Sequence, residues 1–167
     1  MYDELTKQDI AKMEEEIEYR KLVVRKKALA AVKEAREHGD LSENFEYHAA
    51  KKDKNQNESR IRYLERMIKT AKVVSDESKE DEAGLNHTVE VYFEEEDETE
   101  TFTLVTTVRG NSLKGLISIE SPLGKAVFGH KAGDRVNVKV NENYSYDVTI
   151  ISVGKQVNDE EISIRKF

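Results

Sequence analysis

The sequence predicts an α+β protein, in which an N-terminal antiparallel helical coiled-coil hairpin precedes a C-terminal antiparallel β-sheet domain with a short helix. The first half of the chain repeats apolar residues with helical spacing, whereas after residue 86 the apolar period changes to two. A short polar connection around Gly39 divides the first half into two arms. Helices joined by so short a connection fold back antiparallel, which gives the hairpin.

The first arm is expected over residues 7–37, which contain no glycine or proline and follow Thr6, a suitable N-cap. Gly39 stands where helices commonly end in a left-handed residue. About 30 residues at 1.5 Å each give a helix of roughly 45 Å. The apolar positions step by three, four or seven residues, as in a coiled coil, and are Ile10, Met13, Ile17, Val24, Ala28, Ala31 and Ala35.

The second arm is expected from about Glu43 to Val74. Ser42 or Asp40 can cap it. Between residues 51 and 60 its inner face is polar, so we expect the opposite arm, rather than its own packing, to hold this stretch. The apolar positions of the arm are Phe45, Ala49, Ile61, Tyr63, Leu64, Met67, Ile68 and Ala71.

Residues 75–86 are polar and are expected to form a linker, so that the hairpin occupies 1–75, the linker 76–86 and the sheet domain 87–167. Residues 121–130 contain the only proline and are expected to form the short helix, before a turn at 132–134. Strands are expected near 88–93, 101–105, 115–119, 135–140 and 146–153, and the acidic run 94–98 is expected to be a solvated loop.

Composition excludes several classes of site. Cysteine is absent, which rules out disulfides, zinc–thiolate sites and thiol catalysis. The four histidines are scattered, and no two of them have a metal-ligand spacing. No apolar run is long enough to span a membrane, and the polar N-terminus does not resemble a signal peptide. We therefore expect a soluble cytoplasmic protein.

Charge is distributed unevenly along the chain. Residues 1–74 carry a net charge of +2 and residues 75–167 a net charge of −9, within a total of −7. An acidic domain does not wrap a nucleic-acid backbone, because that binding depends on lysine and arginine. Contact with nucleic acid is therefore expected from a local basic face in the first half, and contact with protein from the second half.

The connection between the arms, residues 38–44, holds two acidic residues, Asp40 and Glu43, beside Ser42 and Asn44. One interpretation is purely structural, because Asp followed three residues later by Glu is a capping-box pattern. The other is a half-site for a hard cation, in which two carboxylates leave other oxygen positions of Mg²⁺ to be filled by a partner. Such a half-site suits the second ion of a two-metal phosphoryl-transfer centre.

Two distant motifs resemble the Gre family of bacterial transcription elongation factors, GreA more closely than GreB. The first runs from Glu34 to Asn44 and continues from Glu46 to Lys51. The second is Ser121-Pro-Leu-Gly-Lys-Ala126, followed by Gly129 and Gly133-Asp134. Glu58, Arg60 and Ile61 of the second arm also fit, so the resemblance covers nearly the whole chain in order. It favours a functional role for the tip acids beyond capping.

The resemblance implies that the hairpin enters the secondary channel of bacterial RNA polymerase after the enzyme has backtracked. Asp40 and Glu43 would share a Mg²⁺ with the polymerase active site and position the attacking water, with Ser42 and Asn44 beside them. The polymerase itself would cut the nascent RNA, so the chain is not expected to be a free-standing enzyme. We expect a monomer that holds no cofactor stably and binds no membrane.

The resemblance also implies two binding surfaces. The C-terminal domain, FKBP-like in this family, is expected to grip a coiled coil at the channel rim through Ser121, Pro122, Leu123, Gly124 and Lys125. A basic face near the tip is expected to contact the RNA 3′ segment through Arg36, Lys51, Lys52, Lys54 and Arg60. The alternative for the basic residues is plain solvation of the helix surface, because acidic residues are interspersed among them.

Some residues depart from the family pattern. Phe45 stands where a small residue is common, and residues 55–57 (Asn-Gln-Asn) replace a glycine–aromatic–aliphatic run. These changes put the rigidity of the second arm in question but leave the acids intact. Tyr47 and His48 could stack on a base or transfer a proton, but Tyr47 is expected instead to be buried and to pack against the opposite arm.

Two other functions are weighed against transcript cleavage. One is an inhibitor that occupies the polymerase channel without promoting cleavage, and the intact pair of Asp40 and Glu43 argues against it. The other is an FKBP-type peptidyl-prolyl isomerase, and the few aromatic residues of the acidic domain argue against that activity.

Overall fold

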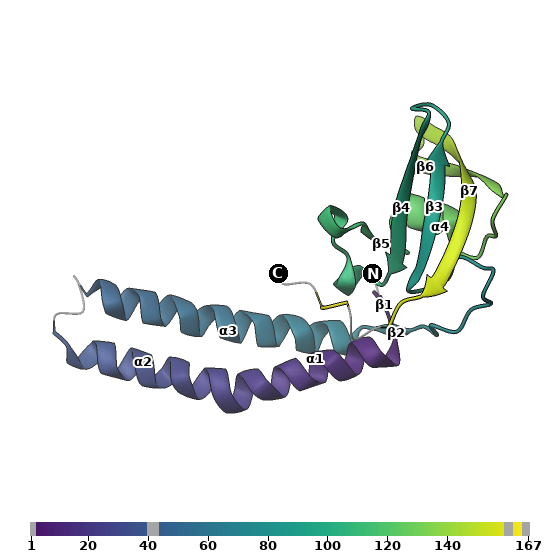
Figure 1. The fold of residues 1–167 in the computed structure, drawn as a ribbon. Helices are drawn as coiled ribbons and strands as arrows, with labels where there is room; N and C mark the ends of the chain where they lie inside the picture. The colour runs from purple at the N-terminus through teal and green to yellow at the C-terminus, as the bar shows by residue number, and fades with distance from the viewer. Residues whose placement is uncertain (1–2, 40–43, 159–161, 165–167) are drawn as a thin grey trace. The chain divides into compact units, whose positions relative to one another are not determined.

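The computed structural model describes residues 3–39, 44–158 and 162–164, and it confirms the α+β class (Figure 1). The chain divides into two compact units. One unit is the helical hairpin of residues 10–71, and the other combines residues 3–9 with the chain from residue 72 onward. The N-terminal segment therefore belongs with the sheet unit, which the sequence did not predict.

The first arm is helical throughout the predicted range, but it is not a regular α-helix. It consists of α1 (Lys7–Tyr19), the π-helical turn η1 (Arg20–Val24) and α2 (Arg25–Glu37). In the π-turn the N–H of Arg25 donates to the carbonyl of Arg20. A π-turn takes up one more residue than an α-helical turn, and such turns often occur at functional positions.

The second arm, α3 (Phe45–Lys69), ends earlier than the predicted Val74. Lys72 and Val73 instead form β2, which pairs in parallel with β1 (Glu4–Leu5). The N–H of Lys72 donates to the carbonyl of Asp3 at 2.9 Å, and the N–H of Val74 donates to the carbonyl of Leu5 at 2.8 Å. These backbone bonds and the burial of Leu5 stop the helix, so the predicted end was wrong.

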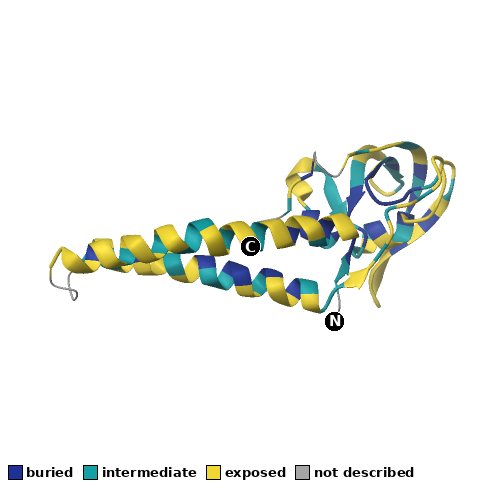
Figure 2. Ribbon diagram, turned by 90° about the horizontal axis from the view of Figure 1, so that it is seen from below, coloured by how far each residue is buried: buried dark blue, intermediate teal, exposed yellow. Residues whose placement is uncertain are grey.

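Burial within the hairpin is uneven along its length. Away from the tip, Met13, Ile61, Leu64 and Met67 are buried between the arms. Toward the tip the buried apolar side chains are alanines, Ala35 and Ala50 (Figure 2). Because an alanine removes little apolar area from water, the tip half of the hairpin gains less from burial than the opposite half.

The sheet of the second unit has the strand order β5-β4-β3-β7-β6. Its strands are β3 (His87–Phe93), β4 (Glu98–Val105), β5 (Leu116–Ser118), β6 (Arg135–Asn141) and β7 (Tyr144–Gln156). The short turns η2 (Thr107–Arg109) and η3 (Ser112–Lys114) connect β4 to β5. β5 runs parallel to β4, whereas the other neighbouring strands are antiparallel. The sheet is therefore mixed, and the prediction of a purely antiparallel sheet was wrong.

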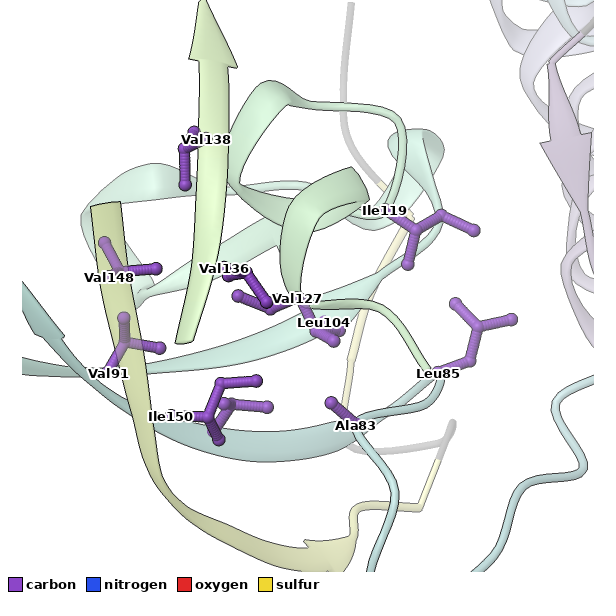
Figure 3. Close-up of a cluster of buried hydrophobic side chains, with 11 residues drawn as sticks. Ala83, Leu85, Val91, Leu104, Ile119, Val127, Val136, Val138, Val148 and Ile150 are labelled. Carbon is purple, nitrogen blue, oxygen red and sulfur yellow. The ribbon is translucent and has the colours of Figure 1, made fainter. Parts of the chain in front are cut away.

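The core of this unit lies between the sheet and α4 (Pro122–Val127), the predicted short helix. Alternate residues of the strands, among them Val91, Val136, Val148 and Ile150, point into it (Figure 3). Ala83 and Leu85 are buried in the same cluster. The segment predicted as a linker thus supplies core residues, and the sheet unit begins before residue 87.

A buried ion pair joins the start of α1 to η2 within the sheet unit. Thr6 and Asp9 cap the helix reciprocally, with the N–H of Thr6 at 3.0 Å from Asp9 Oδ2 and the N–H of Asp9 at 3.1 Å from Thr6 Oγ1. The other oxygen of Asp9 accepts a hydrogen bond from Arg109 Nε, and Arg109 Nη1 donates to the carbonyl of Ile162. Asp9 and Arg109 are both buried, so the ion pair between them offsets part of the cost of burying each charge.

Replacing Asp9 with asparagine is expected to lower the free energy of unfolding by about 3–5 kcal/mol, because the buried Arg109 loses the charge of Asp9. Urea unfolding followed by circular dichroism measures this change. Glu14→Gln, at an exposed position of the same helix, is the matched control and is expected to change stability by less than about 0.5 kcal/mol. Equal effects of the two substitutions would contradict the importance of the buried pair.

Candidate functional site at the hairpin tip

The tip begins where α2 ends. The N–H of His38 donates to the carbonyl of Ala35 at 3.2 Å, and Gly39 follows with a φ of +134°. Side chains other than glycine adopt this φ only with strain, so Gly39 allows the chain to leave the helix here. The predicted end of the first arm is therefore confirmed.

Asn44 organises the described part of the tip. Its Oδ1 accepts a hydrogen bond from the N–H of Tyr47 at 3.0 Å, so Asn44 is the N-cap of α3. Its Nδ2 donates to the carbonyl of Ala35, the last buried residue of α2, at 2.6 Å. One side chain thus caps the second arm and ties it to the first. The expected cap at Ser42 or Asp40 was wrong, and α3 starts at Phe45 rather than Glu43.

Asp40, Ser42 and Glu43 lie outside the described residues, so their site stays a prediction. Within residues 3–39, 44–158 and 162–164, no three histidine, aspartate or glutamate side chains gather in a way that could hold a metal ion. Two carboxylates at the tip are hard oxygen ligands of the kind that Mg²⁺ prefers, but they are too few to enclose it. The fit is that of an incomplete site.

Phe45 occupies the first position of α3 with its side chain 85% exposed. It therefore does not pack between the arms. The large phenylalanine, where the family commonly has a small residue, leaves the packing between the two arms unchanged. Beside it, His38 Nδ1 lies 3.3 Å from Glu46 Oε2, so the end of one arm contacts the start of the other at the surface.

Positive charge converges on Tyr47, next to the tip. The guanidinium of Arg36, from the opposite arm, lies over the Tyr47 ring at 5.6 Å from its centroid, which confirms that this tyrosine packs across the hairpin. The pKa of the Tyr47 hydroxyl lies below its ordinary value, chiefly because of a hydrogen bond from Arg36 and further because of the charges of Lys51, Arg36 and Lys54. Arg36, Lys51 and Lys54 therefore act on one point of the surface.

Lys52 is exposed on the same helix, but Arg60 is not part of this basic face. Arg60 is only 3% exposed, and its Nε and Nη2 donate to the carboxylate of Glu16 at 2.8 and 3.2 Å. The Tyr63 ring lies 5.4 Å from the Arg60 guanidinium. The expectation that Arg60 contacts RNA was wrong, because the charge is neutralised between the arms.

The carboxylate of Glu16 accepts hydrogen bonds from two arginines. Arg20 Nε donates to it at 2.7 Å, in addition to the two bonds from Arg60. Burial raises the pKa of Glu16, but the hydrogen bonds from Arg60 and Arg20 and their charges outweigh this effect, so the pKa lies below its ordinary value. The charged form of Glu16 is therefore the form that stabilises the hairpin.

The segment predicted to dock on polymerase is largely structural. Ser121 caps α4, with its Oγ accepting from the N–H of Gly124 at 3.1 Å and donating to the carbonyl of Ser118 at 2.6 Å. A Cβ on Gly124 would lie 1.9 Å from that same carbonyl oxygen, so only glycine fits. Leu123 packs against the core, whereas Pro122 and Lys125 are exposed. Only these last two side chains are offered freely to a partner.

Comparison with known proteins identifies the chain. Residues 4–73 match the family model described as transcription elongation factor, N-terminal, of GreA and GreB, and residues 77–155 match the corresponding C-terminal model. The chain belongs to the GreA/GreB family of transcription elongation factors. Transcription elongation factor GreA of Thermoanaerobacter pseudethanolicus is 44% identical over 137 residues, which cover 81% of this chain and 87% of that protein. GreA of Streptococcus pneumoniae is 39% identical over 152 residues, covering 90% and 94%.

Among solved structures, the GreA factor homolog Gfh1 of Thermus thermophilus is 24% identical to this GreA/GreB-family chain. The match covers 92% of the chain and 98% of the Gfh1 chain, with a TM-score of 0.43. The family assignment rests on the sequence matches. In the part of the chain that the structure describes, no helix has the length and apolar character to cross a membrane.

Sequence reasoning missed several structural residues of this GreA/GreB-family factor. Asn57 and Arg60 are buried between the arms, yet their spacing with Ile61, Leu64 and Met67 places all of them on one helix face. That helical spacing could have predicted their burial, but polar residues are normally expected at the surface. The pairing of Asp9 with Arg109, 100 residues apart, had no signal in the sequence.

The lowered pKa of Glu16 predicts a pH dependence of hairpin stability. A carboxylate with a depressed pKa in the folded state contributes stability above its unfolded value, near 4.5, and loses it as the pH falls through the folded value. We expect Glu16→Gln to have a lower thermal midpoint than wild type at pH 6. The difference is expected to shrink at pH 3, which lies below the unfolded value, as the pH falls toward the lowered pKa of Glu16 in the folded state.

Circular dichroism at both pH values measures the two midpoints. The comparison with Glu16→Gln is needed because other carboxylates, such as Glu58 paired with Arg25, also have lowered pKa values. Glu15→Gln, at an exposed position of α1, is the control for the loss of one negative charge. A wild-type advantage of the same size at pH 3 and pH 6 would show that Glu16 does not act through its charge.

Proposed function

We propose that this GreA/GreB-family factor stimulates RNA polymerase to cleave its own backtracked transcript. In this proposal the hairpin enters the secondary channel of the polymerase and brings Asp40 and Glu43 to the active site. The chain acts as a donor of ligands and not as a free-standing enzyme. Cleavage leaves a new RNA 3′ end in register, which returns an arrested complex to elongation.

The observation that carries this proposal is the pair of acids in the connection between the two arms. Asp40 and Glu43 would offer carboxylate oxygens to a Mg²⁺ ion shared with the polymerase, and the chain alone leaves the site incomplete. Held by these carboxylates, a Mg²⁺ ion would supply Lewis-acid chemistry for activating water and offsetting charge on the phosphate. The cap and cross-tip bond of Asn44 hold the start of α3 against the end of α2, the two helix ends between which the acids lie in sequence.

The dimensions of the hairpin fit this role. The 25 residues of α3 give an arm of about 38 Å at 1.5 Å per residue. Asn44 stands at the end of that arm, and the proposed ligands precede it in the sequence. A paired arm of this length is suited to delivering ligands into a narrow channel.

The basic face around Tyr47 is proposed to contact the displaced RNA 3′ segment. Arg36, Lys51, Lys52 and Lys54 provide positive charge next to the tip, where a phosphate backbone would pass. Such contacts carry no sequence information, which suits a factor acting on transcripts of any sequence. The acidic sheet unit is proposed to bind polymerase protein instead, with Pro122 and Lys125 at its contact surface.

Alanine at Asp40 or Glu43 is expected to reduce stimulated cleavage by more than about 100-fold, because even outer-shell partners of metal ligands contribute 10- to 100-fold. Polymerase binding is expected to stay nearly unchanged, because the docking surfaces are intact. The assay adds the protein to a stalled elongation complex with Mg²⁺ and measures short 3′ RNA fragments. Binding is measured on the same complexes.

Asp53→Ala removes an exposed carboxylate from α3 outside the tip and is the matched control. Wild-type cleavage by the Asp40 and Glu43 double variant would overturn the tip assignment. Tight binding of the wild-type protein without any cleavage would instead support the inhibitor alternative.

Lys125→Glu tests the docking surface. Reversing this exposed charge is expected to weaken polymerase binding by about threefold to tenfold, mainly through slower association. Cleavage at saturating protein is expected to match wild type, because the tip is untouched. Lys139→Glu, at an exposed position of β6, is the matched control. Equal binding by both variants would place the docking surface elsewhere on the unit.

A further inference from the structure

Four polar residues lie between the arms at the level of the π-turn. Glu16 and Arg20 come from the first arm, and Asn57 and Arg60 come from the second. Asn57 is 4% exposed and Arg60 is 3% exposed, so these groups occupy positions where a coiled coil ordinarily places apolar side chains. We refer to the four residues as the polar lock.

Asn57 uses both ends of its amide on one residue of the opposite arm. Its Oδ1 accepts from Arg20 Nη1 at 3.0 Å, and its Nδ2 donates to the Arg20 carbonyl at 3.3 Å. The same carbonyl accepts the N–H of Arg25 across the π-turn. A donor and an acceptor that must both be satisfied by one residue fit only one alignment of the arms.

Ion pairs extend this alignment in both directions. Arg60 reaches Glu16 with two nitrogens, and Arg25 reaches Glu58 with two nitrogens at 2.8 and 2.9 Å. Two-point contacts of this kind add geometric selectivity to their attraction. A slip of one arm would leave the buried Arg60 charge without its partner, which is costly.

In the tip half of the hairpin, apolar packing alone does little to favour one alignment of the two arms over another. Between the lock and the tip, the buried apolar side chains of the described residues are those of Ala35 and Ala50, while Val24, Ala28, Val32 and Tyr47 are half-buried. Alanines present a nearly uniform surface and bury little area, so one alignment differs little from the next in packing energy. The lock lies where the well-packed half of the hairpin ends.

We infer that the polar lock sets the register of the two arms and that Asn57 is a positioning residue for the tip acids. The effect on cleavage rests on the proposed function, whereas the effect on the register of the arms does not. A slip moves one arm by about 1.5 Å per residue or 5.4 Å per turn. Such a slip would move Asn44, at the start of α3, relative to Ala35, near the end of α2. Misplacing ligands by about 1 Å is enough to reduce a reaction severely.

The Asn57→Leu variant tests the effect of the register of the two arms separately from the effect of stability. Leucine is close to asparagine in size but has no polar group to bond Arg20, and buried polar groups in coiled coils usually cost stability. We expect the thermal midpoint to stay the same or rise. We also expect cleavage at limiting Mg²⁺ to fall by about tenfold, with the loss smaller at saturating Mg²⁺, because misplaced ligands weaken the shared site.

The register is measured directly in the protein alone. The chain has no cysteine, so spin labels can be attached to Lys33→Cys and Arg62→Cys, at exposed positions on opposite arms. Pulsed dipolar spectroscopy is expected to show one narrow distance when Asn57 is present and a shifted or second distance in the Asn57→Leu variant. Asn55→Leu makes the same change at an exposed position two residues away and is expected to leave both distance and cleavage unchanged.

An unaltered single distance in Asn57→Leu would falsify the lock. A shifted distance with full cleavage in Asn57→Leu would overturn the positioning role. A loss of cleavage that is accompanied by a lowered thermal midpoint, and is explained by that loss of stability, would also overturn it. If wild-type protein fails to stimulate cleavage at all, the proposed function is rejected, and the distance comparison alone then decides whether the lock sets the register.

Discussion

A hairpin of two helices has only one interface in which to bury side chains, and this constraint governs the arrangement of the molecule. Each arm faces solvent over most of its circumference, so apolar packing is confined to a single seam. In this chain the seam is well filled only away from the tip, by Met13, Ile61, Leu64 and Met67. The rest of the hairpin relies on directional contacts, namely the ion pairs, Asn57 and the cap at Asn44.

The chain passes between the two units at two places. Residues 3–9 lead into α1, and residues 72 onward follow α3, yet both segments belong to the sheet unit. The parallel pairing of β1 with β2 joins these segments directly. The capping box of Thr6 and Asp9 is completed by Arg109, so the start of the first arm depends on a residue from the far half of the sequence.

Periodicity predicted both arms, the main strands and α4, because each of these elements buries one face and therefore repeats. The two-residue strands β1 and β2 are too short to show a period. The parallel direction of β5 was missed because alternation is the same for both directions of pairing. Cap choice at the tip was also underdetermined, since Asp40, Ser42 and Asn44 are all good cap residues, and only the structure selects Asn44.

Site residues were predictable where the family motif names them, but burial was not. Arg60 was grouped with the exposed lysines because charge normally implies solvent, whereas Glu16 provides a buried counter-charge from 44 positions away. Ser121 and Gly124 were expected to contact polymerase, and both turn out to shape α4. A motif identifies which residues matter without separating those that bind a partner from those that build the surface it binds.

The π-turn has a consequence for the length of the chain. An α-helix rotates successive side chains by about 100°, so losing one residue from a regular stretch would turn every later residue of the arm, Arg36 included, to another face. The turn from Arg20 to Val24 already holds one residue more than an α-helical turn. A residue removed there restores a regular helix and leaves the tip side of the arm facing the same way. Relatives with a first arm one residue shorter are therefore expected to align with their gap inside this turn.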